Sequence, residues 1–205
     1  CRIYFMKKIA VFASGAGTNT QKIIEYTSPP APLHGVERGG RKPPKVQVAL
    51  IVSNKSDAGV LKIAAKENIP VLLLEKEKFF SGNAYTDELK EEGIDLIVLA
   101  GFLWKLPPAL IRAFPQRIIN IHPALLPKYG GKGMYGKHVH QAVIDNKEKE
   151  SGISIHYVDE LYDHGKIIFQ ARCPVLANDT ADSLAARIHQ LEHEYYPRII
   201  ESLLK

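Results

Sequence analysis

The sequence Asn120-Ile121-His122-Pro123 places an amide and an imidazole two residues apart at the end of an apolar run. Successive side chains of a strand point to opposite faces, so we expect Asn120 and His122 to share one face. Pro123 cannot donate to a central ladder, which predicts that the strand stops there. A hydrogen-bond donor then lies beside a titratable base at the carboxyl end of a strand, where open α/β sheets build their sites. Taken alone, these four residues favour a strand end with a structural role.

A glycine-rich turn follows the first apolar run of the chain. The run Lys7 to Ala13 is expected to form a buried strand, and residues 14–19 (Ser-Gly-Ala-Gly-Thr-Asn) a tight turn before a helix over 20–26. Thr18 or Asn19 is available as the N-cap of that helix. Glycines allow a ligand close to the backbone, and a helix N-terminus attracts anions. The turn matches neither the full dinucleotide fingerprint nor a Walker A loop, so it favours phosphate binding only slightly over a structural turn.

An acidic loop between two predicted strands carries Asp159, Glu160, Asp163 and His164. A carboxylate from this loop is expected to orient His122, to raise its pKa above about 6.5 and to keep it protonated. Acidic loops are usually solvated, and this one alone would indicate nothing more.

Three further histidines are candidates for ligand contacts. His189 and Glu192 are one turn apart on the last predicted helix and could face a ligand together, although such pairs are often simply exposed. His138 and His140 lie near a second glycine-rich segment, but no Cys or Glu motif completes a metal shell around them. The sequence therefore predicts no metal.

The pattern of apolar residues predicts alternating strands and helices. Strands are expected over 46–52, 71–74, 96–100 and 118–121, and helices over 58–66, 85–92, 138–145 and 181–204. Near-continuous Val, Ile and Leu runs indicate a parallel sheet covered on both faces. Two later strands, over 152–158 and 167–174, suit a hairpin or long-loop pair. We therefore predict an α/β, doubly wound, mostly parallel sheet with helices on both faces, mixed toward its C-terminal part.

Length and composition indicate one globular domain over residues 1–205, with residues 1–5 as extra leader before Met6. Hydrophobic residues make up 45% of the chain, and no apolar run is long enough to span a membrane. Two cysteines are too few for a disulfide framework, which favours the cytoplasm. Much of the net charge of +5 lies in residues 37–45, expected to be a surface loop. No aromatic residues interleave these charges, so neither nucleic acid nor a membrane is the expected partner.

The combined motifs resemble the folate-dependent formyltransferase family. The resemblance rests on residues 14–19, on Ala100-Gly101-Phe102-Leu103, on 120–129 (Asn-Ile-His-Pro-Ala-Leu-Leu-Pro-Lys-Tyr) and on 159–165 (Asp-Glu-Leu-Tyr-Asp-His-Gly). These segments occur in the family's order and at roughly its spacing over nearly the whole chain. The resemblance implies a Rossmann-like formyltransferase fold.

The resemblance also implies roles for individual residues. It assigns catalysis to Asn120, His122 and Asp163. Contacts with the nucleotide substrate are implied for Gly17, Thr18, Asn19, His189 and Glu192. Contacts with folate are implied for Leu103, Trp104, Lys105, Leu106, Asn120, Asp159, Glu160, Leu161, Tyr162 and Asp163.

The implied reaction moves a formyl group from 10-formyltetrahydrofolate to the amine of glycinamide ribonucleotide, in purine (IMP) biosynthesis, without a metal. A monomer or a homodimer is expected. The nearest alternatives are formyltetrahydrofolate deformylase, in which water attacks, and methionyl-tRNA formyltransferase. Each of those relatives carries a further domain, and the first strand expected here already begins at Lys7, which favours transfer to the small substrate. A non-catalytic nucleotide-binding protein on the same scaffold is the alternative from another class.

Overall fold

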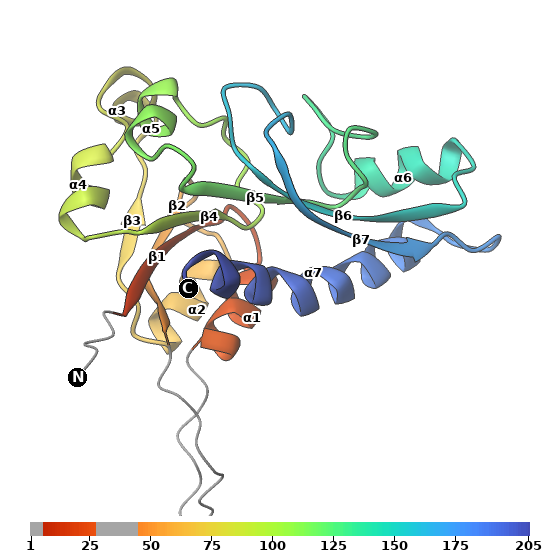
Figure 1. Ribbon diagram of the computed structural model, residues 1–205, viewed down its shortest axis with the longest axis horizontal. Coiled ribbons are helices and arrows are strands. Elements are labelled where there is room, and N and C mark those ends of the chain that lie inside the picture. The colour runs from red at the N-terminus through yellow and green to blue at the C-terminus, as the bar shows by residue number, and fades with distance from the viewer. Residues whose placement is uncertain (1–5, 28–44) are drawn as a thin grey trace, which may run out of the picture.

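The computed structural model describes residues 6–27 and 45–205 (Figure 1). Residues 1–5, expected to be extra leader, and residues 37–44 of the basic segment lie outside the described residues. The elements are, in chain order, β1 (Lys7–Phe12), α1 (Thr18–Thr27), β2 (Val46–Ser53), α2 (Val60–Lys66), β3 (Val71–Leu73), α3 (Lys76–Ser81), α4 (Thr86–Glu91), β4 (Leu96–Leu99), α5 (Pro108–Ala113), β5 (Ile118–His122), α6 (Lys137–Asp145), β6 (Glu150–Tyr157), β7 (Ile167–Pro174) and α7 (Ala181–Leu203).

The strands form one seven-stranded sheet in the order β3-β2-β1-β4-β5-β6-β7. The pairs from β3 through β5 are parallel, whereas β6 pairs antiparallel with both β5 and β7. The predicted α/β fold is therefore confirmed, including the change to a mixed sheet in the C-terminal part. The change of strand direction falls beside β5, the strand that carries Asn120 and His122.

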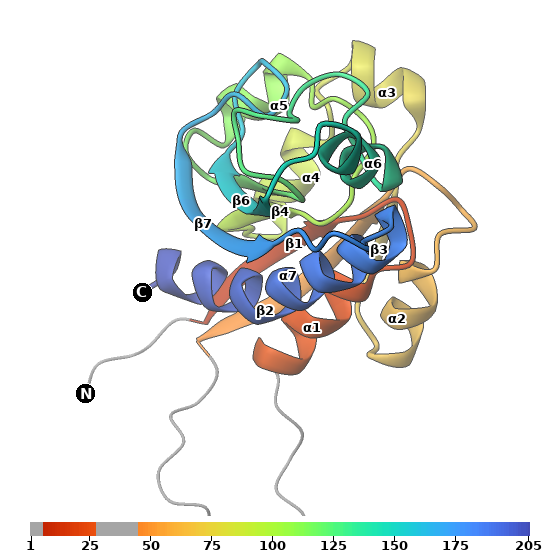
Figure 2. The ribbon, with the colours of Figure 1, turned by 90° about the vertical axis from the view of Figure 1, so that its right-hand side faces the viewer.

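Two hydrophobic cores cover the two faces of the sheet. The core on one face joins β1 and β2 to α1, α2 and α7, and the core on the other joins the same strands to α3, α4 and α5. Figures 1 and 2 show these two groups of helices on opposite sides of the sheet. None of the described helices is long and apolar enough to cross a membrane.

The differences from the predicted elements have local causes. The short helices α3 and α5 were not predicted, because six residues give too little periodicity to identify a helix. Helix α1 begins at Thr18, so Thr18 and Asn19 lie inside the helix and the prediction that one of them caps it was wrong. Gly17, at φ +80°, makes the turn, and a Cβ there would lie 2.8 Å from Val60.

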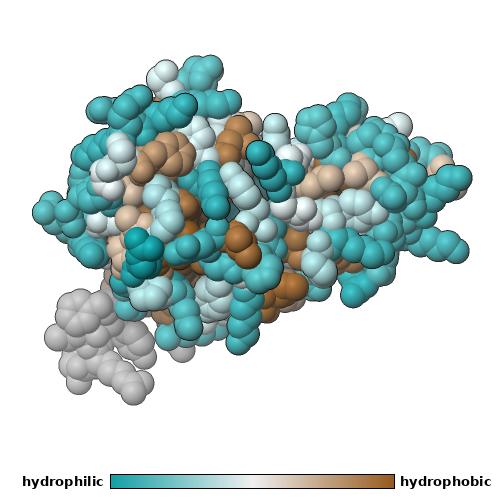
Figure 3. Space-filling model, turned by 90° about the horizontal axis from the view of Figure 1, so that it is seen from above, coloured by the Kyte–Doolittle hydropathy of each residue, from teal (hydrophilic) through white to brown (hydrophobic). Residues whose placement is uncertain are grey.

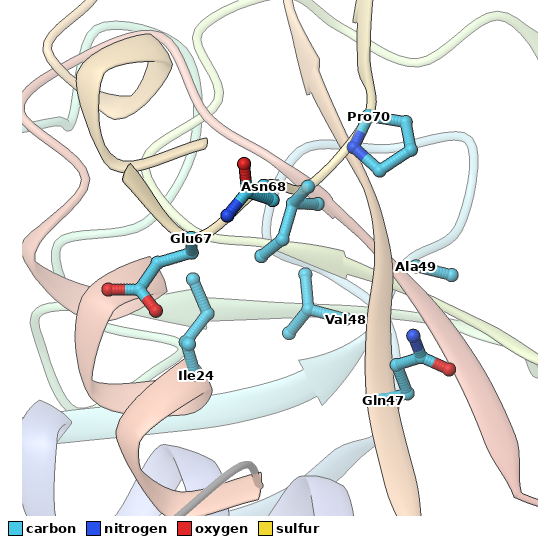
Figure 4. Close-up of a pocket in the computed structure, with 8 residues that line it drawn as sticks. Ile24, Gln47, Val48, Ala49, Glu67, Asn68 and Pro70 are labelled. Carbon is cyan, nitrogen blue, oxygen red and sulfur yellow. The ribbon is translucent and has the colours of Figure 1, made fainter. Parts of the chain in front are cut away.

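One cavity of about 160 Å³ lies between α1, β2 and the turn before β3 (Figure 4). Its lining consists of Ile24, Gln47, Val48, Ala49, Glu67, Asn68, Ile69 and Pro70. None of these residues belongs to the predicted site, and Glu67 is the one titratable side chain among them. The cavity is therefore separate from the predicted site.

The start of α7 is fixed by an ion pair and a capping box. Asp179 accepts hydrogen bonds from Arg187 Nη1 at 2.7 Å and Nη2 at 3.0 Å, and from the Leu176 amide at 2.7 Å. These bonds, the Arg187 pair foremost, hold the pKa of Asp179 far below its usual range. Thr180 and Ser183 complete the box.

Asp179→Ala is expected to lower the free energy of unfolding by about 3 kcal/mol, because it leaves Arg187 and the Leu176 amide without their shared partner. Urea denaturation followed by circular dichroism measures this loss. Glu194→Ala, which removes an exposed pair with Arg198 on the same helix, is the control and should cost less than about 1 kcal/mol. Equal losses in the two variants would contradict the assignment.

Candidate active site

The carboxyl end of β5 presents Asn120 and His122 on one face of the sheet. Ile119 precedes Asn120, and Ile121 lies between Asn120 and His122. Both isoleucines pack into the core formed with α1 and α7, so the two polar side chains point to the opposite face. The strand ends at His122, as Pro123 predicts. The side chain of His122 is 4% exposed, so its imidazole is removed from bulk water.

Asp163 reaches this strand end from the loop between β6 and β7. Its Oδ1 accepts from Asn120 Nδ2 at 3.3 Å, and its Oδ2 lies 3.6 Å from His122 Nδ1. The Gly131 amide donates to Oδ2 at 3.0 Å. The loop closes tightly because Gly165 has no side chain: a Cβ there would lie 1.8 Å from the Tyr157 carbonyl oxygen. The structure thus brings together the three residues that the sequence analysis assigned to catalysis.

His156 is a fourth member of the group that the sequence analysis missed. It lies directly opposite Asn120 in the antiparallel pairing of β5 with β6, and its Nε2 lies 3.2 Å from Asn120 Nδ2 and 3.5 Å from Asp163 Oδ1. Its Nδ1 donates to the Tyr157 carbonyl at 2.8 Å. In the neutral ring Nε2 is therefore an acceptor, and it orients the amide of Asn120.

Burial and charge act in opposite directions on the site's two coupled groups. Burial lowers the pKa of His122, and this exceeds the raising effects of the Asp163 charge and the Tyr129 carbonyl. The expectation that Asp163 lifts the pKa of His122 above its ordinary value was therefore wrong, because it neglected desolvation. Burial also raises the pKa of Asp163, but hydrogen bonds and the nearby histidines outweigh it and leave that pKa below its ordinary value. At neutral pH a neutral imidazole faces a carboxylate.

A second polar group joins α1 to α7 at the same edge of the sheet. Glu192 is buried, and its Oε2 accepts from Asn19 Nδ2 and contacts His189 Nδ1, both at 2.9 Å. The hydrogen bond that His189 donates to Glu192 raises the pKa of His189. The charge of Glu192 is the weakest of the named influences on the pKa of His122, which it raises. Thr18, on the first turn of α1, is exposed beside them.

The two segments predicted to contact folate lie next to each other. Lys105 Nζ lies 5.5 Å from the centre of the Tyr162 ring, and Arg112 on α5 pairs with Glu160 at 3.4 Å. Leu103, Leu161 and Tyr162 are exposed, whereas Leu106 is buried in the core and can offer a ligand only its backbone. Seen from above, hydrophobic residues form small groups among hydrophilic ones (Figure 3).

Trp104 and Asp159 hold these two segments in shape. Trp104 packs against Phe79, Phe80 and Phe102. Asp159 accepts from the Leu161 amide at 2.9 Å and contacts His164 at 3.1 Å. Only Asp163 of the acidic loop turns inward, while the other polar side chains remain near the surface.

His138 and His140 do not form a pair. His138 is exposed at the start of α6, whereas His140 is buried, and burial lowers its pKa. Within residues 6–27 and 45–205, no group of three or more His, Cys, Asp or Glu side chains is arranged to hold a metal ion.

The family follows from comparison with known proteins. Residues 7–200 match the family model described as formyl transferase, which covers nearly all of the chain. The chain therefore belongs to the formyl transferase family, whose name states the transfer of a formyl group.

Within this family, the chain is similar to proteins named phosphoribosylglycinamide formyltransferase. The chain is 45% identical over 96% of its length to the chloroplastic enzyme of that name from Vigna unguiculata, but it spans only 61% of that relative. It is 36% identical to the Haemophilus influenzae protein of the same name and spans 86% of it. The crystal structure of that enzyme from Bacillus halodurans superposes with a TM-score of 0.80 at 35% identity, covering 97% of this chain and 96% of the other.

Proposed function

We propose that the chain transfers a formyl group from 10-formyltetrahydrofolate to the amine of glycinamide ribonucleotide, giving formylglycinamide ribonucleotide and tetrahydrofolate in purine biosynthesis. The observation that carries the proposal is the convergence of three polar side chains at the end of β5, where Asp163 lies 3.3 Å from Asn120 Nδ2 and 3.6 Å from His122 Nδ1. The names of the relatives supply the substrate. In the reaction the amine nitrogen bonds to the formyl carbon, the bond from that carbon to the folate nitrogen breaks, and one proton passes from the amine to the folate nitrogen.

Asn120 is suited to stabilise the charge that develops on the formyl oxygen. Its Nδ2 makes two long contacts, 3.2 Å to His156 and 3.3 Å to Asp163, so a substrate oxygen can compete for its hydrogens. A donor already aimed at a developing oxyanion commonly lowers the barrier by about 3 kcal/mol. We assign this role to Asn120, with His156 keeping the amide turned the correct way.

His122 is suited to accept the proton from the attacking amine. Its Nε2 donates to the Tyr129 carbonyl at 2.7 Å, so in the neutral ring the lone pair lies on Nδ1. Nδ1 is 3.6 Å from Asp163 Oδ2, and the imidazolium formed by proton uptake is therefore stabilised by an adjacent carboxylate. The reaction needs this proton to pass on to the leaving nitrogen, and His122 is placed to return it.

The remaining residues are assigned to substrate binding. The turn at Gly17 and the first residues of α1, Thr18 and Asn19, are suited to the phosphate, because free amide groups and the helix dipole point there. Glu192 Oε2 is held by Asn19 and His189, which leaves its other oxygen to accept from the glycinamide end. A phosphate held at a distance from the amine helps to place the amine for attack.

The folate is assigned to the adjoining segments 103–106 and 159–163. The planar ring systems of a folate fit a surface with exposed Leu103, Leu161 and Tyr162, and Lys105 beside them carries a charge opposite to that of the folate's carboxylates. Backbone groups of the acidic loop are available to hydrogen-bond the pterin edge. These contacts and those of the nucleotide meet at β5.

Asp163→Asn is expected to change both the rate and its pH dependence. Because burial already lowers the pKa of His122, activity should rise with pH through a value below 6.5 and be level near neutrality. The Asp163 charge raises that pKa, so its removal should move the acid limb of kcat/KM to lower pH. Loss of the counterion for the imidazolium should also cut kcat about 100-fold.

A pH–rate profile of each protein measures both effects, with Asp145→Asn, an exposed carboxylate at the end of α6, as the control. A profile in Asp163→Asn that keeps the wild-type midpoint would contradict the assignment of His122 as the base.

The test of the proposed function is a spectrophotometric assay of folate product from 10-formyltetrahydrofolate, run with and without glycinamide ribonucleotide. Product that forms only with the nucleotide supports the proposal. Equal product in both reactions would indicate deformylase activity, and no product in either would indicate a binding protein.

We further propose that the chain acts as a single domain, as a monomer or homodimer, in the cytoplasm. The sparse cysteines, of which Cys173 is a buried free thiol, favour a reducing compartment. The plant relatives are named as chloroplastic, and that location is stated of those proteins alone. Light scattering during gel filtration measures the oligomeric state.

A further inference from the structure

The loop after β5 makes backbone hydrogen bonds to both His122 and Asp163. The Tyr129 carbonyl accepts from His122 Nε2 at 2.7 Å, and the Gly131 amide donates to Asp163 Oδ2 at 3.0 Å. The first of these bonds decides which nitrogen of neutral His122 carries its hydrogen. The position of the Tyr129 carbonyl therefore determines whether Nδ1 is available to accept a proton.

The side chain of Tyr129 is held by a hydrogen bond to a residue outside the site. Its hydroxyl donates to Glu148 Oε1 at 2.9 Å, and the Nζ of neighbouring Lys128 reaches the same oxygen at 2.8 Å. Glu148 lies in the turn between α6 and β6, where its amide donates to the Val143 carbonyl at 3.2 Å. One carboxylate therefore ties two consecutive side chains of the loop to a fixed part of the fold.

The backbone conformation of Tyr129 is strained, so a contact that holds the residue in place is needed. Tyr129 has a φ of +57°, a strained left-handed conformation that residues with a Cβ seldom adopt. Relaxation of this residue would turn its carbonyl away from His122. A hydrogen bond at the far end of the same side chain opposes that relaxation.

We propose that Glu148 is a positioning residue for the reaction, which it serves through Tyr129 by holding the carbonyl that fixes the hydrogen of His122 on Nε2. The inference rests on the proposed function for its kinetic consequence, but its structural part concerns the ligand-free protein alone. Glu148 does not touch the reacting atoms. Its effect should be on kcat and on the titration of His122, and not on the binding of either substrate.

The other charged and titratable groups around His122 lie on side chains that Tyr129→Phe and Glu148→Gln do not alter. They are Asp163 in the β6–β7 loop, His156 on β6, Glu192 on α7 and, from α6, His140. A change in His122 caused by altering Tyr129 or Glu148 is then attributable to the loop after β5, through the Tyr129 carbonyl and the Gly131 amide that holds Asp163. Because that carbonyl raises the pKa of His122, loosening it should lower the pKa further.

The experiment compares Tyr129→Phe and Glu148→Gln with Glu150→Gln. Tyr129→Phe removes one oxygen, Glu148→Gln keeps the size of the side chain but weakens its two contacts, and Glu150 is an exposed carboxylate two residues along that pairs with Arg172. The first readout is NMR titration of the His122 ring in ligand-free protein. We expect its pKa to fall by roughly half a unit in both test variants and to stay unchanged in the control.

The second readout is steady-state kinetics with both substrates. In the test variants kcat should fall by about tenfold while the two KM values stay within about twofold of wild type. The double variant should be no worse than either single variant, because both changes cut the same tie. Thermal unfolding confirms that each variant is folded.

A folded Tyr129→Phe protein with an unchanged His122 pKa and unchanged kcat would overturn the inference, even if its melting temperature fell, because the tie would then be purely structural. Loss of the same size in Glu150→Gln would also overturn it. Tyr129→Phe decides the matter alone if Glu148→Gln does not fold. If wild type shows no formyl transfer, the proposed function fails, and the NMR titration still decides whether Glu148 positions His122.

Discussion

Asn120→Ala is expected to lower kcat by about 100-fold to 1,000-fold, equivalent to about 2.7–4 kcal/mol of transition-state stabilisation. The amide is the donor placed at the end of β5 to meet negative charge on the formyl oxygen, and alanine offers no hydrogen there. Because the charge develops mainly in the transition state, KM should change little. Initial rates over a range of both substrate concentrations separate the two constants.

Two further variants sharpen the Asn120 test. Asn120→Asp keeps the size of the side chain but replaces the donor by an acceptor, so its loss should be at least as large. Asn178→Ala removes an exposed amide before α7 and should leave kcat unchanged. A folded Asn120→Ala protein with kcat near wild type would remove Asn120 from the mechanism.

His122→Ala is expected to lower kcat by about 1,000-fold, or about 4 kcal/mol, which is within the usual contribution of a positioned general base. The variant should also lose the acid limb of the pH–rate profile, because that limb is assigned to the titration of His122. Since alanine leaves a space of imidazole size beside Asp163, added imidazole should restore part of the rate. The measurement is kcat against imidazole concentration.

The control for His122 is His138→Ala, which removes an exposed imidazole on α6. That variant should keep the wild-type rate and should not respond to imidazole. An acid limb that persists unchanged in His122→Ala would show that another group is the base.

The fold was largely predictable because its strands are long apolar runs. β1, β2, β4 and β5 bury residues of both faces, so each appears in the sequence as a near-continuous run of apolar residues. Helix α5 was missed although Pro108 occupies its first turn, a position that proline favours. The helix has only six residues, too few for its apolar residues to show a helical period.

Site residues could be predicted where they are close in sequence or match a family motif. They could not be predicted where their position depends on the register of strand pairing. Asn120 and His122 share a strand, so their common face followed from alternation. His156 belongs to a different strand, and its position opposite Asn120 depends on how β6 pairs with β5. A signal was present, since Ser154 and His156 alternate with Ile153 and Ile155. The pKa of His122 depends on burial, which a sequence does not supply.

Trp104 is the one tryptophan of the 205 residues, and it lies in the segment assigned to folate. Its indole is partly buried against Phe79, Phe80 and Phe102, one residue from exposed Leu103. A ligand that settles on this segment changes the polarity and the quenching around that ring. Trp104 fluorescence, excited selectively, should therefore report the binding of a ligand to this segment. The measurement needs neither an added label nor catalytic turnover.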